Sequence, residues 1–425
     1  MTSTNQDASV DAPSTVDSGY SWFRLAISLA IATIGGIGLW SIVVVLPVLQ
    51  AEFQVARGAA SFPYTLSMLG LAFGGVIMGR LADRFSIVAP IIVGAIALAI
   101  GYIAAAYSTS LWMFAIIQGG IIGMFGSSAT FGPLVADISH WFVKRRGLAV
   151  AICASGNYLS GTIWPPIISH FVSTVGWRTT YIGIGVFCVV TMIPLALLLR
   201  RPSPKQATVN AAGISSDPGA EKLQALGVSG NTLQALLVLA GVACCVAMSM
   251  PQVHIVAYCA DLGFGPARGA EMLSVMLGLG IVSRISSGWL SDKIGGVKTL
   301  LIGSVMQAIT LLLYIPFNGL MSLFVVSALF GLAQGGIVPS YALIVREYFP
   351  AKEAGTRVGL VLMSTIVGMA LGGWLSGVIY DVTGSYQAAF LHGIAWNVLN
   401  GAIGMWLLLR GRRVMRRSET RAVAA

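Results

Sequence analysis

Arg284 is the residue whose type and position in this sequence are best suited to bind an anion. It lies in the apolar interval 272–291, eight positions before Asp292, or about 12 Å along a helix. A charge inside so apolar a segment must face water, an ionic partner or an anion. Gly280 and Gly288 lie one helical turn to either side and leave room for a carboxylate, which the planar guanidinium could bind through two parallel hydrogen bonds. A permanent pair with an aspartate, or a side chain extended towards the inner surface, is the structural alternative.

Other polar residues in apolar intervals are candidates for binding or proton coupling. His254 could titrate near neutral pH, and Asp261 could alternate between a protonated form and one paired with an arginine. A packing role for His254 and a helix-end role for Asp261 are the alternatives. Residues that could line a cavity, or form helix-packing hydrogen bonds instead, are Gln118, Asn157, Tyr158, Trp164, Gln334 and Tyr341. Of these, Asn157, Gln118, Gln334 and Tyr341 join Arg284 in the predicted substrate site.

The composition places these residues in a membrane protein. Charged residues make up 9% of the 425 residues, against roughly 25% in soluble domains. Hydrophobic residues reach 56%, and the mean hydropathy is +0.84. The five cysteines lie in apolar runs without the spacing of metal ligands, so we expect neither a disulfide framework nor a metal site.

The neutral intervals predict twelve membrane-spanning helices, because a spanning helix needs roughly 20 apolar residues. Intervals 85–136 and 299–345 are each long enough for a helical hairpin. The intervals are 25–51, 58–79, 85–136, 147–177, 179–199, 223–260, 272–291, 299–345, 358–380 and 382–409.

Basic residues predict the orientation, because cytoplasmic loops carry an excess of Lys and Arg. With a cytoplasmic N-terminus, the outer side receives only Arg57, Arg178 and Arg268, and nearly all other basic residues fall inside. The net charge of +10 therefore reflects topology, and nucleic acid is not an expected partner. Arg284 belongs to neither side, and at that depth its charge costs about 2.5–3.5 kcal/mol on insertion scales.

The chain divides into two similar halves around a polar segment rich in Pro, Ser, Gly and Ala. We expect a disordered cytoplasmic tail (1–20), a six-helix bundle (21–200), a cytoplasmic linker (201–231), a second six-helix bundle (232–412) and a basic cytoplasmic tail (413–425). The hexapeptide GRLADR at 79–84 recurs as GWLSDK at 288–293, 209 positions later. Such duplication favours a transporter with its site between the halves.

The repeated hexapeptide has a structural chemistry of its own. Its glycine allows close helix approach, and its aspartate can cap a helix or pair with a basic residue. The predicted cytoplasmic gate consists of Gly79, Asp83, Arg84, Gly288, Asp292 and Lys293. These repeats resemble the G-x-L-a-D-x-x-G-x-x-[RK] loop of the major facilitator superfamily, which implies an all-α membrane fold of two pseudo-symmetric six-helix bundles. Ser86 replaces the second glycine in the first copy, whereas Gly295 keeps it in the second.

Further segments resemble the monocarboxylate transporters and the related oxalate/formate antiporters. They are WFVKRRGLA at 141–149, VHIVAY at 253–258 and the spacing of Arg284, Gly288 and Asp292. The resemblance implies an organic anion as substrate. The sequence departs from the group at Gly280, where monocarboxylate transporters often carry Asp, and it lacks their helix 1 Lys. One fixed positive charge suits a monoanion better than a dianion.

These observations predict a secondary active transporter for a small organic monocarboxylate, proton-linked or working by anion exchange, in the cell inner (plasma) membrane. A proton-coupled efflux carrier for drug-like molecules is the alternative, although helix 5 reads GNYLSG at 156–161 instead of G-P-x-x-G-G. A non-transporting nutrient receptor is the alternative from another class. Because no nucleotide-binding loop, metal cluster or nucleophile–base motif occurs, we expect no enzyme activity and no cofactor.

Overall fold

The computed structural model describes residues 16–201, 222–223 and 226–424, and its regular structure there is helical. The first half contains α1 and α2 (Gly19–Gly35, Ile37–Phe53), α3 (Arg57–Phe85), α4 (Val88–Ala106), the run α5–η1–η2–α6 (Leu111–Ile117, Gln118–Gly126, Ser127–Thr130, Gly132–Trp141), α7 and α8 (Arg146–Ala154, Gly156–Val175) and α9 (Trp177–Leu198). The second half contains α11 (Gly230–Asp261), α12 (Pro266–Ile294), α13 (Gly296–Leu313), α14 and α15 (Leu320–Gln334, Ile337–Tyr348), α16 (Ala351–Thr383) and α17 (Tyr386–Ala424).

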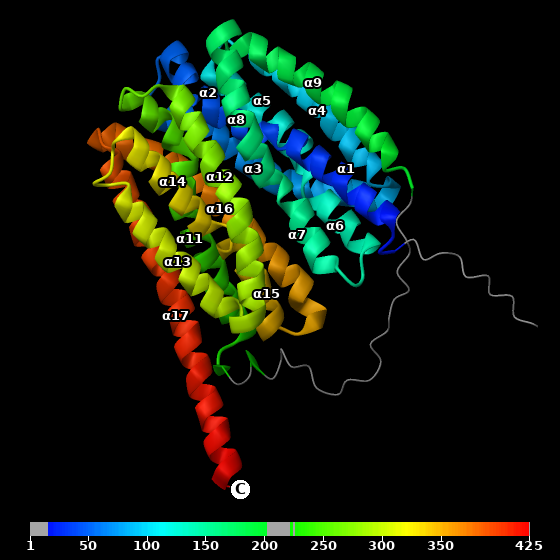
Figure 1. Ribbon diagram of the computed structural model, residues 1–425, viewed down its shortest axis with the longest axis vertical. Coiled ribbons are helices and arrows are strands. Elements are labelled where there is room, and N and C mark those ends of the chain that lie inside the picture. Colours follow the sequence, from blue (N-terminus) through cyan, green and yellow to red (C-terminus); the bar gives the residue numbers. More distant parts are fainter. Residues whose placement is uncertain (1–15, 202–221, 224–225, 425) are drawn as a thin grey trace, which may run out of the picture.

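These segments form twelve long helical units, six in each half, as the neutral intervals predicted (Figure 1). Ten of the units are long and apolar enough to cross a membrane by length and composition. The pair α7–α8 and the helix α17 complete the twelve. Residues 1–15 and most of the linker lie outside the described residues, so the expected tail and linker stay predictions. The helix α17 continues through the segment expected as the basic tail.

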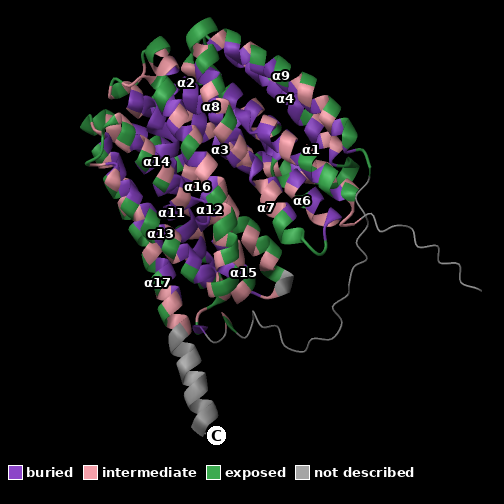
Figure 2. Cartoon of the chain, in the orientation of Figure 1, coloured by how far each residue is buried: buried purple, intermediate pink, exposed green. Residues whose placement is uncertain are grey.

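Large apolar side chains cover the outside of the bundle, where they would contact lipid. Phe73, Trp112, Val190 and Met321 are each at least 60% exposed. Figure 2 shows the buried residues gathered between the helices, with exposed residues on the outer faces and at the ends. A soluble monomer rarely leaves so much apolar surface in water, so this distribution fits a protein surrounded by lipid.

Within each half, glycines allow two helices to touch backbone to backbone. A Cβ atom at Gly70 of α3 would lie 2.1 Å from the Gly119 carbonyl oxygen of η1. In the second half the glycine lies on the other helix of the corresponding pair: a Cβ at Gly331 of α14 would lie 2.1 Å from the Met276 carbonyl oxygen of α12. The close packing that small residues allow at such crossings stabilises helix association in lipid, where the hydrophobic effect between helices is weak.

The halves meet mainly along two helix pairs. On one side α3 packs on α16, where Thr65 Oγ1 donates a 3.0 Å hydrogen bond to the Ala370 carbonyl. On the other side α8 packs on α12, where the Ser274 hydroxyl donates to the Thr162 carbonyl. We call the end of the bundle at the N-terminus of α3 the Arg57 end, and the opposite end, which carries both hexapeptides, the hexapeptide end.

Candidate functional site

Arg284 lies on α12 where that helix faces α7 and α8 of the other half. Its Nη1 donates a 3.2 Å hydrogen bond to the Ala154 carbonyl, and its Cζ lies 4.4 Å from the centroid of the Tyr158 ring. Its Nε is buried, and neither Nε nor Nη2 has a hydrogen-bond partner among the described residues. No acidic group lies within ion-pair distance of Arg284 in that part of the chain. The guanidinium therefore keeps one two-donor edge, Nε and Nη2, without a protein acceptor.

The neighbours of Arg284 come from both halves. A Cβ atom at Gly280 would lie only 2.5 Å from Tyr158 Cε1, so the tyrosine ring occupies the space next to this glycine. Asn157 precedes Tyr158, and its carbonyl accepts a 3.0 Å hydrogen bond from the Trp40 indole of α2. The buried side-chain oxygen of Asn157 has no partner among the described residues. Of the polar residues predicted to bind substrate with Arg284, Asn157 is the one that adjoins a residue in contact with Arg284, namely Tyr158.

Three other residues expected in the site are fully buried within their own halves. Gln118 Nε2 donates a 2.8 Å hydrogen bond to the Gly38 carbonyl. Gln334 accepts a 2.6 Å hydrogen bond from Gln252. Tyr341 donates a 2.6 Å hydrogen bond to Asn400. In this state these side chains join helices of one half to each other, and a role for them in binding stays a prediction.

The two coupling candidates lie towards the Arg57 end. His254 is fully buried on α11, where its Nε2 donates a 2.7 Å hydrogen bond to the Gly373 carbonyl of α16. Asp261, at the end of α11, accepts hydrogen bonds of 3.0 and 3.1 Å from Nη1 and Nη2 of Arg57. The Arg57 side chain is 6% exposed and that of Asp261 33%, so the carboxylate is the member of the pair that solvent reaches.

Further groups of the second half converge on the N-terminus of α3. Tyr386 of α17 accepts a hydrogen bond from Arg57, and the Tyr380 ring centroid lies 4.8 Å from the Arg57 guanidinium carbon. Asp381 accepts hydrogen bonds of 2.8 and 2.7 Å from the backbone N–H groups of Arg57 and Gly58. This carboxylate caps two backbone N–H groups at the N-terminus of α3, a helix of the other half, that have no acceptor within the helix. Charge counting assigned Arg57 to a surface loop and gave no sign of this network.

The gate residues lie at the opposite end in a different environment. Asp83, Arg84, Asp292 and Lys293 are exposed, and none forms an ion pair with another described residue. Lys293 Nζ lies 3.7 Å from the ring centroid of Trp289 on its own helix. The ion pair that joins the halves is therefore the one at the Arg57 end, as far as the described residues go.

The two turns after the hexapeptides each contain a residue with positive φ, which glycine favours. Gly295 ends α12 with φ 86° and ψ 161°, and Ser86 ends α3 with φ 147° and ψ 169°. Residues other than glycine rarely adopt positive φ at such ψ values. The serine therefore preserves the turn at the cost of backbone strain.

The family model described as Major Facilitator Superfamily matches residues 28–320 and 272–424, which together include nearly the whole chain. The chain belongs to this superfamily. Similar curated proteins include monocarboxylate transporter 13 of Bos taurus, 27% identical with 80% of this chain and 78% of the relative covered. Monocarboxylate transporter 11 of Homo sapiens is 25% identical, with 88% and 80% covered. The MFS-type transporter YcxA of Bacillus subtilis is 26% identical, with 80% and 83% covered.

Solved structures confirm the superfamily fold. A bacterial homologue of the human lysosomal transporter Spinster superposes with a TM-score of 0.70 at 16% identity, covering 94% of this chain and 98% of that one. The nucleoside transporter NupG also gives a TM-score of 0.70, at 15% identity, with 90% and 99% covered. Because the family model covers nearly the whole chain, the protein is a secondary transporter of the major facilitator type that moves a small molecule.

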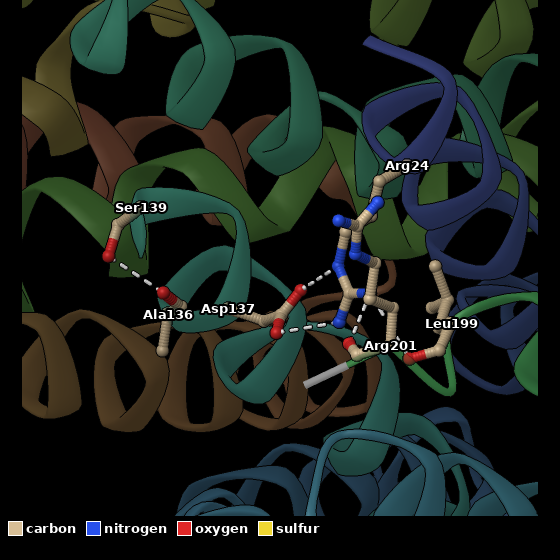
Figure 3. Close-up of polar contacts among 6 residues, drawn as sticks. All are labelled: Arg24, Ala136, Asp137, Ser139, Leu199 and Arg201. Carbon is tan, nitrogen blue, oxygen red and sulfur yellow. Dashed lines mark hydrogen bonds and ion pairs between the residues drawn. The ribbon is translucent and has the colours of Figure 1, made fainter. Parts of the chain in front are cut away.

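One more ionic cluster lies inside the first half of this superfamily member (Figure 3). Arg24 of α1 donates 2.8 and 2.9 Å hydrogen bonds to Asp137 of α6, and their side chains are 1% and 9% exposed. Arg24 Nη1 also donates to the carbonyls of Leu199 and Arg201, just after α9 ends. By sequence, Arg24 counted only among the basic residues of the inner side, with no predicted partner. The positions of Arg24 and Asp137 near the same membrane face were the one available signal that they could pair.

Proposed function

We propose that this transporter carries a small organic monocarboxylate, and that Arg284 binds the carboxylate. The observation that carries the proposal is the Nε–Nη2 edge of the guanidinium, which has no protein acceptor and no acidic partner among the described residues. Such an edge matches the two oxygens of a carboxylate, and a single uncompensated positive charge matches a monoanion. The resemblance to monocarboxylate transporters 13 and 11 supports the same substrate class.

Alternating access supplies the transport step. The Arg57 end is bridged by Arg57, Asp261 and Asp381, while the charged gate residues at the hexapeptide end are exposed. We take the hexapeptide end to be cytoplasmic, with both termini on that side, because nearly all basic loops lie there. On this proposal the protein lies in the cell inner (plasma) membrane, and the Arg57 bridge holds its outer side together. Labelling a cysteine at position 210, which lies outside the described residues, from each side of the membrane tests this orientation.

Asp261 is the stronger of the two coupling candidates. It is partly exposed at the Arg57 end and paired across the halves, so its protonation would weaken the bridge at the side from which protons arrive. The charged and titratable groups around it are Arg57, Asp381, Tyr380, Tyr386 and, one layer further in, His254. Proton coupling predicts uptake that depends on a pH gradient. Anion exchange predicts uptake that depends on carboxylate on the other side.

Loss of Arg284 tests the proposed substrate site. We expect Arg284→Ala to abolish binding and uptake of labelled acetate, pyruvate and benzoate in proteoliposomes while the protein still folds, because an intramembrane charge without an ionic partner is removed. Arg284→Lys should retain little function, since an ammonium cannot reproduce the planar two-donor contact. Arg268→Ala is the matched control, because Arg268 is an exposed arginine of the same helix, paired with Glu271. Wild-type affinity in folded Arg284→Ala protein would exclude the site.

A further inference from the structure

Tyr158 and Gly280 form a contact between the halves that touches Arg284 directly. Tyr158 belongs to α8 of the first half and is 7% exposed. Gly280 belongs to α12 of the second half, one helical turn before Arg284. A Cβ atom at position 280 would lie 2.5 Å from Tyr158 Cε1 and 2.6 Å from Cδ1, closer than real Cβ contacts allow. The ring can therefore lie here only because position 280 has no side chain.

The Tyr158 ring fills the space left beside Gly280, which we call the notch, and supports the guanidinium of Arg284. Arg284 Cζ lies 4.4 Å from the ring centroid, within the range of a cation–π contact. The Ala154 carbonyl, four residues before Tyr158 in the first half, accepts a 3.2 Å hydrogen bond from Arg284 Nη1. One face and one nitrogen of the guanidinium are thus fixed by the first half, and the Nε–Nη2 edge is the part left for a ligand.

We propose that Tyr158, seated in the notch left by Gly280, is a positioning residue for Arg284. It fixes the plane of the guanidinium so that the Nε–Nη2 edge is presented to a carboxylate. The inference rests on the proposed function of Arg284 and adds that the site requires both halves. An aromatic face orients a cation without neutralising it, whereas an aspartate at position 280 would compete with an anionic substrate. This arrangement preserves the positive charge for the ligand.

Two substitutions test the ring itself, with equilibrium binding of labelled acetate, pyruvate and benzoate as the readout. Tyr158→Phe keeps the aromatic face and should bind within about twofold of wild type. Tyr158→Leu removes the face and should weaken binding roughly 30-fold, the scale of a desolvated cation–π contact. Apparent melting temperature without carboxylate serves as the structural readout. A purely structural tyrosine would lower the melting temperature and leave the affinity of the folded fraction unchanged.

The notch is tested by a double-mutant cycle. Gly280→Ala should displace the ring and weaken carboxylate binding to about the level of Tyr158→Leu. In the Tyr158→Leu background the same change should cost little more, because the ring that it displaces is gone. Gly278→Ala is the matched control, because a Cβ there would meet Thr162 at an ordinary 3.4 Å.

The outcomes separate this inference from the proposed function. Loss of binding in Arg284→Ala together with wild-type binding in Tyr158→Leu would overturn the positioning role and leave the substrate site intact. Wild-type binding in folded Arg284→Ala would overturn both. Where Tyr158→Leu does not fold, Gly280→Ala decides alone: unchanged carboxylate affinity in that variant overturns the inference, and a loss of affinity beyond that of Gly278→Ala supports it.

Discussion

Arg57 and Asp261 join the two halves of the transporter through two parallel hydrogen bonds of 3.0 and 3.1 Å. Arg57 begins α3 in the first half and Asp261 ends α11 in the second, so separation of the halves at this end must break the pair. The Glu52–Arg178 pair lies near the same end but joins α2 to α9 within one half. The Arg57–Asp261 pair is therefore expected to control separation of the halves at this end. The Glu52–Arg178 pair is expected only to stabilise the first half.

Arg57→Gln should open the Arg57 end. A cysteine replacing Thr65, which is 8% exposed and bonded to the Ala370 carbonyl of the other half, reports separation through its reaction with a membrane-impermeant maleimide. We expect labelling from that side to be at least about tenfold faster than with Arg57 intact, the effect of shifting the equilibrium by ~1.4 kcal/mol.

Arg178→Gln is the control for this experiment, since it removes a pair at the same end that lies within the first half. It should leave labelling at position 65 unchanged. The five native cysteines are all buried, so their background reaction should be low. Equal acceleration by both substitutions would show that the Arg57 pair has no special role in closure.

Ser86→Gly should stabilise the protein. Ser86 has φ 147° where Gly295, its counterpart, has φ 86°, and glycine adopts such values without strain. We expect a gain of about 1 kcal/mol, seen as a rise of roughly 2 °C in the apparent melting temperature. Ser86→Ala is the control, because it removes the hydroxyl and keeps the Cβ. Stabilisation by alanine would place the effect in the side chain and not in the backbone.

Breaking the Arg24–Asp137 pair should destabilise the first half. Either Arg24→Met or Asp137→Leu leaves one charge buried without its ionic partner, at a cost of about 3–5 kcal/mol. The double variant should recover most of that loss, because neither charge then remains. Thermal stability of the four proteins gives the coupling energy. Additive losses in the double variant would mean that the two residues do not act as a pair.

The gate residues should affect turnover more than binding. Asp83→Asn and Asp292→Asn remove exposed carboxylates at the hexapeptide end, whose proposed role is in closing that end during the cycle. We expect uptake to fall at least about tenfold while carboxylate affinity changes little. Glu271→Gln, an exposed acid on α12 near the other end, should preserve uptake. Weaker binding with normal turnover would move Asp83 or Asp292 from the gate to the substrate site.

The sequence by itself determined the fold class, because ten long neutral intervals, two of them long enough for a helical hairpin, cannot remain in water. It also singled out Arg284, since an arginine far from both ends of an apolar interval has no surface explanation. The repeat of the hexapeptide predicted the duplicated halves, and it marked Ser86 as the departure from a glycine. Each of these conclusions depends on the identity of a residue and its distance along the chain.

The tertiary structure decided which faces of the helices meet. Inside a bilayer the lipid and the protein core are both apolar, so a helix such as α11 carries no hydrophobic stripe that tells its buried face from its outer face. The sequence therefore could not separate Asn157, next to the Tyr158 that contacts Arg284, from Tyr341, enclosed within its own half. Nor could it pair Arg57 with Asp261, 204 positions apart, or place Tyr158 against Gly280. Those contacts depend on how the helices rotate and cross, which packing between side chains sets.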